Sequence, residues 1–368
     1  MSLQVEIDKK SKEIQTDSYS MSIGELMNMY KDKELQIQPD FQRFFRWTDS
    51  QKTKFIESIL LGIPIPPIFV SQSRSGIWDV IDGLQRLSTI LEFTGILKGA
   101  EKKPIPPSVL QPTKFLPSLK GKMWNNPEDE ENSFTEEQRI DFKRAKLDIN
   151  IIKKNSDVDA KYELFQRLNT GGTSLTPQEI RNCLMIMLNK DFYKWVSDLR
   201  DLEAFQNCLP LTDKQINEQE DMEIVLRFLV YRYTDTNTIK GNEDISDFIT
   251  DKMMLIIEDE QFSYEVEEKA FTESFTYLDE LLGENSFKKF DHVKNKFLGA
   301  FSISSFEAIT VGLSNNIAAL KQKQNEEVID MIKNIYTMNE FENASRRGIR
   351  AINRFKKLTG LSEEVFKQ

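Results

Sequence analysis

The pattern of hydrophobic and polar positions divides the chain into a mixed first part and a helical second part. Up to about residue 155, short apolar runs of strand length alternate with segments of helical periodicity. The predicted strands cover 68–70, 78–81 and 147–152, and an extended segment begins at 35–37. Predicted helices begin near residues 49, 84 and 136, and the helix from 84 runs to about 97. After residue 155 the helical period predominates, with predicted helices at 157–168, 177–188, 213–233, 244–258, 264–282, 303–320, 325–336 and 341–357.

This pattern predicts an α+β fold with two domains. The first, residues 1–155, is a small mixed domain, and the second, residues 156–368, is mostly helical. Within the first domain, the segment 99–133 is rich in proline and ends in an acidic run, so we expect a long surface loop or insertion there. No fixed-period repeat is present, which disfavours a solenoid.

Composition excludes several classes of protein. No apolar run approaches the roughly 20 residues of a membrane span, and the N-terminus lacks the apolar region of a signal peptide. Only Cys183 and Cys208 are present, so we expect a reducing cytoplasm and no membrane partner. His292 is the single histidine, in an apparently helical context, which argues against sites that need several histidines.

Charge is distributed unevenly along the chain. The net charge is −10, which argues against a generally basic nucleic-acid-binding protein. Residues 1–150 are nearly neutral, with 21 basic and 22 acidic side chains, whereas the remainder carries 28 and 37. Any contact with DNA must therefore involve a local basic patch.

The segment 80–89, VIDGLQRLST, is the most informative candidate site. The buried strand predicted at 78–81 is followed by Asp82 at the N-cap position of a helical pattern, with Gln85 at the spacing of a capping box. Gly83 allows a close approach of the backbone, and Arg86 adds a guanidinium to a helix N-terminus that suits phosphate. The alternative is a capped helix in which Arg86 pairs with Asp82.

Two further clusters accompany this turn. The segment 39–47, PDFQRFFRW, places Gln42 and Arg43 among aromatic rings, a combination that binds bases or nucleotides but also suits the edge of a core. The segment 165–173, FQRLNTGGT, ends a predicted helix, and Asn169 and Gly171 could line a site or form a simple helix–turn–helix junction. The next helix begins with a capping box after Thr176.

Read in order, these motifs resemble a known family. The series is Pro-x-Phe-Gln-Arg-x-x-x-Trp, Ile-Pro-Ile-Pro-Pro-Ile, Val-Ile-Asp-Gly-Leu-Gln-Arg-Leu-Ser-Thr-Ile and Phe-Gln-Arg-Leu-Asn-Thr-Gly-Gly-Thr, spread over roughly residues 23–190. It is similar to the N-terminal domain family of the GmrSD-type restriction endonucleases, which has a ParB/sulfiredoxin-like fold. The resemblance implies a component of a bacterial modification-dependent restriction or anti-phage defence system.

The resemblance also implies a chemistry for the turn. In similar proteins an Asp-Gly-Gln-Gln-Arg motif is linked to hydrolysis of a nucleoside triphosphate with Mg²⁺. On that basis Asp82, Gln85 and Arg86 are expected to be catalytic, with Asp82 also as the metal ligand. Nucleotide contacts are expected from Gln42, Arg43, Gly83, Asn169 and Gly171.

The chain departs from the family pattern at two points. Leu84 stands where the family usually has its first Gln, so hydrolysis is in doubt if that amide contacts the nucleotide. A single histidine cannot supply the HNH nuclease domain of fused members, so we expect a separate nuclease partner. The alternative function is a non-catalytic DNA-binding or regulatory subunit that recruits this nuclease, and DNA cleavage by the domain itself is less favoured.

A basic stripe near the C-terminus is consistent with binding to DNA, and modified phage DNA is among the expected partners. Arg346, Arg350, Arg354 and Lys357 have a spacing that would place them on one face of the predicted helix 341–357. Such a face could follow a phosphate backbone. The alternative is a solvated face that balances the acidic surroundings.

Overall fold

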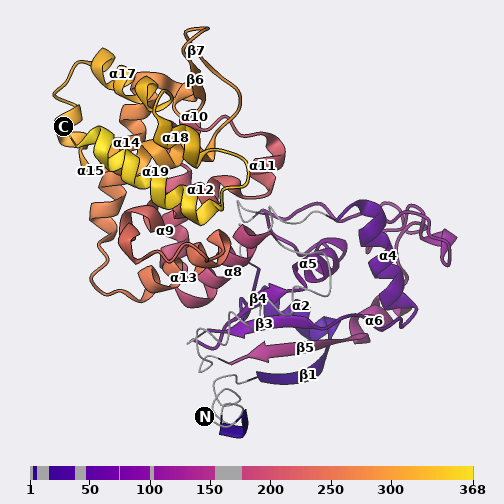
Figure 1. Ribbon diagram of the computed structural model, residues 1–368. Helices are drawn as coiled ribbons and strands as arrows, with labels where there is room; N and C mark the ends of the chain where they lie inside the picture. Colours follow the sequence, from indigo (N-terminus) through magenta and orange to yellow (C-terminus); the bar gives the residue numbers. More distant parts are fainter. Residues whose placement is uncertain are drawn as a thin grey trace. The chain divides into compact units, whose positions relative to one another are not determined.

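A computed structural model describes residues 3–5, 16–37, 47–73, 75–99, 103–153 and 176–367 of the chain. The chain forms two compact units, an N-terminal unit of residues 1–174 and a helical unit of residues 175–368. The N-terminal unit contains a mixed sheet with helices, and the helical unit is built almost entirely of helices (Figure 1). The predicted α+β class is therefore confirmed.

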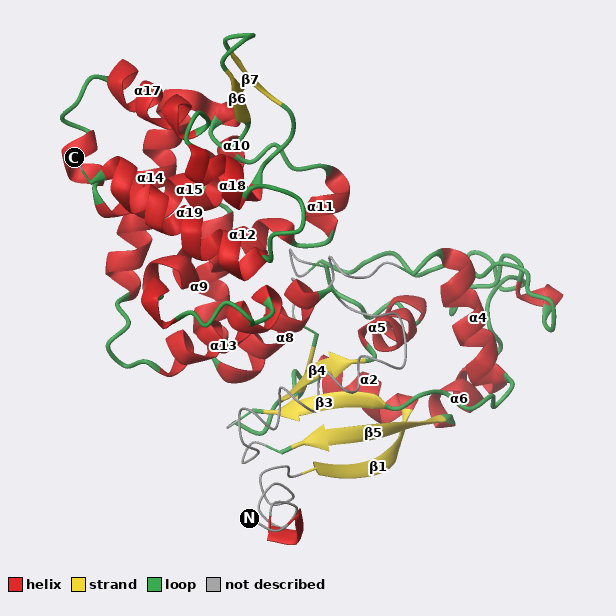
Figure 2. Cartoon of the chain, in the orientation of Figure 1, coloured by secondary structure: helices red, strands yellow, loops and turns green. Residues whose placement is uncertain are grey.

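The N-terminal unit is organised by a five-stranded sheet in the order β1-β5-β3-β4-β2 (Figure 2). β3 pairs in parallel with β5 and antiparallel with β4, and β4 pairs in parallel with β2. The strands are β1 (Thr16–Ser22), β2 (Leu35–Gln36), β3 (Ile68–Gln72), β4 (Trp78–Asp82) and β5 (Lys146–Ile152). The three strands predicted from the sequence are present as β3, β4 and β5, and the extended segment predicted from residue 35 contains β2. β1 is an additional strand, antiparallel to β5.

Three helices of this unit, α2, α4 and α6, begin where the sequence supplies a capping side chain. Thr48 and Thr135 each form a capping box with the glutamine three residues later, as predicted. Gly62 ends α4 in a left-handed conformation, with φ +65°. The helices are α2 (Ile23–Lys31), α4 (Asp49–Leu60), α5 (Leu84–Phe93), α6 (Glu136–Arg144) and the short 3-10 helix η1 (Pro117–Leu119).

The long loop between α5 and α6 contributes to the core of the N-terminal unit. Leu110 and Leu119 are almost fully buried, although the loop contains only a short 3-10 helix as regular structure within residues 103–135. Trp124 packs edge-to-face against Phe93 of α5 and Phe142 of α6, with ring centroids 5.7 and 5.5 Å apart. These apolar anchors account for the order of the loop.

The helical unit is packed around α15, whose residues from Ser304 to Ser314 are all buried. Gly312 lets α19 approach closely, because a Cβ at that position would lie 2.0 Å from the carbonyl oxygen of Ser362. The helices are α8 (Pro177–Leu188), α9 (Lys190–Arg200), α10 (Glu203–Cys208), α11 (Asp213–Asn217), α12 (Glu220–Tyr233), α13 (Ile245–Glu258), α14 (Tyr264–Leu282), α15 (Ile303–Asn315), α16 (Ile317–Leu320), α17 (Asn325–Ile335), α18 (Asn339–Ala344) and α19 (Ala351–Phe366). Two 3-10 helices, η3 (Thr236–Thr238) and η4 (Gly283–Asn285), complete the helical elements.

Several predicted helices of this unit are divided or displaced. The predicted helix 213–233 is broken where Gln219 adopts φ +61°, and 303–320 is divided after Asn315. His292 is not in a helix but follows β6 (Lys289–Asp291), which forms a hairpin with β7 (Lys296–Leu298). The predicted helix 157–168 lies outside the described residues. Among the described residues, no helix has both the length and the apolar character of a membrane span.

Candidate functional site

The turn between β4 and α5 has a different geometry from the predicted capping box. Asp82 is the last residue of β4, and Gly83, with φ +91°, occupies the N-cap position without a side chain to cap the helix. The predicted N-cap role of Asp82 is therefore wrong. The reason is the left-handed conformation of Gly83, which inserts one residue between the strand and the helix.

Gly83 is also constrained by its surroundings. A Cβ at this position would lie 2.9 Å from Cγ1 of Ile68 and 3.3 Å from its Cα. The backbone conformation and the close approach of β3 both favour glycine here. The turn is thus a fixed element of the N-terminal unit.

The guanidinium of Arg86 is held by three acceptors within the protein. Its Nη2 donates to Oδ2 of Asp82 at 2.8 Å, and its Nη1 donates to the carbonyl oxygens of Pro66 and Pro67, the latter at 3.0 Å. The pairing of Arg86 with Asp82 that the sequence offered as an alternative is therefore present. The Arg86 side chain is 12% exposed, whereas that of Asp82 is 38% exposed. The guanidinium thus orients a carboxylate that solvent can reach.

Gln85 connects this turn to the end of the aromatic motif 39–47. Its Oε1 accepts the backbone N–H of Trp47 at 3.2 Å. The ring of Trp47 packs edge-to-face against Phe55 of α4, with centroids 5.4 Å apart, as expected for the edge of a core. Gln42 and Arg43 lie outside the described residues. The first two motifs are thus joined at Trp47.

Leu84 lies on the apolar side of the turn. Its side chain is partly buried and packs against the hydrophobic core of the N-terminal unit. The departure from the family pattern therefore occurs at a position that contacts the core.

The turn offers a limited set of groups for a phosphate and a metal ion. No side chain caps the first turn of α5, so the helix N-terminus retains its tendency to bind anions. Among the described residues, no cluster of three or more histidine, cysteine or acidic side chains could hold a metal ion. A single carboxylate such as Asp82 suits Mg²⁺ when substrate phosphates supply further ligands.

A shallow cavity of about 220 Å³ lies elsewhere in this unit. It is lined by Tyr30, Lys31, Gly95, Ile96, Lys98 and Pro104, at the C-terminal end of α5. Because α5 has ten residues, its two ends are about 15 Å apart. The cavity is therefore separate from the Asp82–Arg86 turn.

The third motif is only partly described. Asn169 and Gly171 lie outside the described residues. The predicted capping box after it is confirmed, because the Thr176 hydroxyl accepts the N–H of Glu179 at 3.2 Å and the Glu179 carboxylate accepts the N–H of Thr176 at 2.7 Å.

The predicted basic stripe does not lie on one helix face. Gly348, with φ +91°, interrupts the chain between α18 and α19, so Arg346 precedes the helix and Arg350 is its N-cap. Arg354 is inside α19 and its guanidinium donates to the carboxylate of Glu307, and Lys357 is exposed. The prediction failed because a left-handed glycine breaks the periodicity that the spacing implied.

Sequence analysis also missed a chain of buried polar groups in the helical unit. It runs through α8, α12, α15 and α19 by hydrogen bonds of 2.6 to 3.2 Å, and its members are Arg181, Glu223, Arg227, Tyr231, Glu307 and Arg354. Charged residues within otherwise apolar helical patterns were the available signal. The bonds of Arg227 to Glu223 and Tyr231 lie within α12, whereas the other links join α8 with α12, α12 with α15, and α15 with α19, so the chain stabilises the packing of this unit.

Burial and neighbouring charges shift the pKa values of the two glutamates in opposite directions. Burial raises the pKa of Glu307 and outweighs the guanidinium of Arg354. Burial also acts to raise the pKa of Glu223, but the guanidiniums of Arg227 and Arg181 outweigh it and lower that pKa. The same network thus contains one carboxyl that resists ionisation and one that favours it.

Residues 23–186 match the GmrSD restriction endonuclease, N-terminal domain. The match covers the sheet of the N-terminal unit from α2 onward and ends within α8. Neither the curated proteins nor the solved structures contain a match to this chain.

Proposed function

We propose that this chain is a component of a restriction system and that its Asp82–Arg86 turn binds and hydrolyses a nucleoside triphosphate. The match of residues 23–186 to the GmrSD restriction endonuclease N-terminal domain supports this proposal. Hydrolysis would control DNA cleavage by a separate nuclease. The observation that carries the proposal is the solvent-accessible carboxylate of Asp82, oriented by Arg86 beside an uncapped helix N-terminus.

Each group at the turn has a role that follows from its contacts. The N-terminus of α5 would bind a phosphate through backbone N–H groups, and Asp82 would hold Mg²⁺. Bound Mg²⁺ would neutralise phosphate charge. Arg86 is a positioning residue in this proposal, because three of its five N–H donors already serve Asp82 and two carbonyl groups. Gln85 would position the segment that carries Gln42 and Arg43, through its bond to Trp47.

Phosphate release from GTP, ATP, CTP and UTP tests this proposal. The measurement compares wild type with Asp82→Asn and Arg86→Ala, with and without Mg²⁺ and DNA. We expect Mg²⁺-dependent turnover in wild type and a loss of at least about 100-fold in Asp82→Asn, in line with the loss of a group that stabilises transition-state charge. Arg86→Ala should lose less, since it acts through Asp82.

A matched control is available in the same unit. Asp32 is exposed at the C-cap of α2, next to Lys31 of the cavity at the far end of α5, so Asp32→Asn removes an accessible carboxylate away from the turn. Its turnover should equal that of wild type. Absence of both nucleotide binding and turnover in folded wild type would contradict the proposal.

One observation favours the alternative of a regulatory subunit without turnover. Three of the five N–H donors of Arg86 already serve acceptors within the protein, which limits what its guanidinium can offer to a phosphate. Under this alternative, the chain binds DNA and recruits a nuclease, and a nucleotide would bind without release of phosphate. Nucleotide binding measured by calorimetry, beside the turnover assay, separates the two functions.

A further inference from the structure

Basic side chains concentrate on the β6–β7 hairpin of the otherwise acidic helical unit. Residues 175–368 carry 24 basic and 34 acidic side chains, yet residues 288–296 contain four lysines and a histidine against one aspartate. The hairpin projects from the helices of this unit (Figure 1). A local positive charge is thus presented on a protruding element.

The turn of the hairpin is held in one conformation by its own aspartate. The carboxylate of Asp291 accepts the backbone N–H groups of Val293 at 2.9 Å and Lys294 at 3.0 Å. The bond from Lys294 is the main reason that the pKa of Asp291 lies below its ordinary value. Val293, at the tip, is 96% exposed. The single carboxylate of the hairpin therefore serves the turn.

The base of the hairpin is anchored to the helical unit. Phe290 is 8% exposed and contacts Phe297 on the opposite strand, with ring centroids 5.0 Å apart. His292 Nε2 lies 3.0 Å from the carbonyl oxygen of Lys333 in α17, and the hydroxyl of Tyr336 donates to the carbonyl oxygen of Lys288 at 3.1 Å. These contacts fix the direction in which the tip points.

Three lysines of the hairpin remain accessible. The Lys294 side chain is 62% exposed, and its Nζ lies 3.9 Å from the Asp291 carboxylate. Lys296, opposite Asp291 in the ladder, is exposed and forms no ion pair among the described residues. Lys289 is exposed, with its Nζ 5.7 Å from the ring centre of Phe341.

Of the carboxylates near the hairpin, Glu284 neutralises one of its four lysines, and two others pair with cations outside it. The pairs are Glu284 with Lys288 at 2.8 Å, Asp330 with Lys333 at 3.0 Å, and Glu342 with Arg346 at 3.0 Å. Glu340 of α18 is exposed. The hairpin therefore keeps a net positive charge.

We propose that the β6–β7 hairpin is a contact surface for the phosphate backbone of double-stranded DNA. A two-stranded ribbon fits the major groove, and lysines along it can reach phosphates on either side. This inference rests on the proposed function, because a restriction system acts on DNA and DNA is therefore the anionic partner that we expect for these lysines. The inference goes further by naming the surface to which the DNA would bind.

Binding of the full chain to a fluorescein-labelled 20-base-pair duplex, followed by anisotropy at several salt concentrations, tests this inference. The test variant is Lys294→Glu/Lys296→Glu. Its affinity should fall about tenfold or more at 0.1 M salt, and the slope of log K against log salt should decrease by about 2, because each lost phosphate contact contributes about 0.9.

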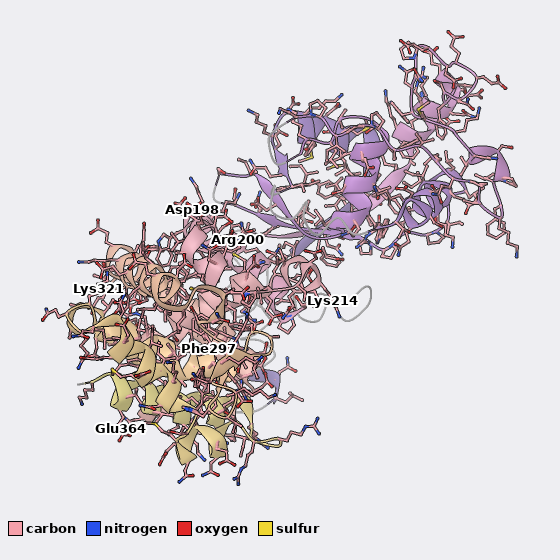
Figure 3. All side chains as sticks on the ribbon, turned by 90° about the horizontal axis from the view of Figure 1, so that it is seen from above. Asp198, Arg200, Lys214, Phe297, Lys321 and Glu364 are labelled. Carbon is pink, nitrogen blue, oxygen red and sulfur yellow. The ribbon has the colours of Figure 1, made fainter. Side chains whose placement is uncertain are left out.

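The control variant, Lys194→Glu/Lys321→Glu, makes the same change in net charge at exposed lysines of α9 and of the turn after α16. Lys321 and Phe297 of β7 are well separated in Figure 3. The control should bind the duplex nearly as well as wild type does. Circular dichroism spectra check that both variants are folded.

Two outcomes overturn the inference. If the hairpin variant binds like the control, the DNA surface lies elsewhere and the hairpin serves another contact. If wild type does not bind the duplex at 50 mM salt, the hairpin is not a DNA surface. Phosphate release is measured independently of either result, so failure here is distinguishable from failure of the nucleotide proposal.

Discussion

The two units each contain an arginine–carboxylate pair, and the pairs differ mainly in the exposure of the carboxylate. In the helical unit, Arg354 donates to Glu307 at 2.7 Å, and the Glu307 side chain is fully buried. In the N-terminal unit, Arg86 donates to Asp82 at 2.8 Å, and the Asp82 side chain is 38% exposed. The same kind of ion pair, at nearly the same distance, thus occurs once with a buried carboxylate and once with an exposed one.

This difference separates a structural pair from a candidate reactive one. A buried carboxylate depends on its partner, because water cannot replace the lost interaction. A half-exposed carboxylate keeps access to water and metal ions while the arginine fixes its orientation. Distance alone does not distinguish the two pairs.

The largest effect is expected from removing the cation of the buried pair. Arg354→Ala leaves Glu307 with its Tyr231 contact but without a guanidinium, so the unfolding free energy of the helical unit should fall by about 3–5 kcal/mol. Urea unfolding followed by circular dichroism measures this. Arg346→Ala, which removes an exposed pair with Glu342, serves as the control and should leave the midpoint unchanged.

The next effect concerns Gly83, which lies between the two residues of the Asp82–Arg86 pair. Gly83→Ala introduces a Cβ 2.9 Å from Ile68 at a positive φ, which should cost about 2–3 kcal/mol. Gly62→Ala has a similar φ but nothing within 4 Å, so its cost should be about 1 kcal/mol. Equal losses would show that the close approach of β3 is unimportant. Tryptophan fluorescence reports on this unit, which contains three of the four tryptophans.

A smaller effect is expected when lysine replaces Arg86, which keeps the positive charge but removes the planar guanidinium. Arg86→Lys retains a cation, yet an ammonium cannot reach Asp82 and two carbonyl groups with the same geometry. The unfolding free energy of the N-terminal unit should fall by about 1–2 kcal/mol, measured by urea unfolding. Stability equal to wild type would show that the bonds to the prolines contribute nothing.

The smallest effect is a pair of opposite pH dependences in the buried network. The pKa of Glu307 is raised on folding, so wild type should lose stability relative to Glu307→Gln as pH rises above the ordinary glutamate value. The pKa of Glu223 is lowered, so wild type should gain stability relative to Glu223→Gln as pH rises toward that value. Unfolding measured from pH 3 to pH 7 checks both signs. Slopes of the same sign would contradict the assignment.

Local signals in the sequence predicted much of the fold. The capping boxes after Thr48, Thr135 and Thr176 were correct, because three residues and their backbone are enough to define them. β1 was missed because most of its side chains are exposed, so an alternating apolar pattern is absent. The helix across Gly348 was wrong because spacing does not reveal a left-handed residue.

The candidate site was predicted in part. Its location at the β4–α5 turn and the pairing of Asp82 with Arg86 follow from residues four positions apart. The bonds from Arg86 to Pro66 and Pro67 and from Trp47 to Gln85 join residues 19 to 38 positions apart. Such contacts depend on how the strands and helices pack.

The sequence by itself determined the α+β class, most strands of the sheet, the similarity of residues 23–186 to the GmrSD N-terminal domain and the position of the turn. Only the tertiary structure decided which carboxylates are buried, which arginines are already paired, and that the basic hairpin projects from the acidic unit. The physical reason is that backbone preferences and capping act between neighbouring residues. Burial and charge pairing depend on segments that folding brings together from distant parts of the chain.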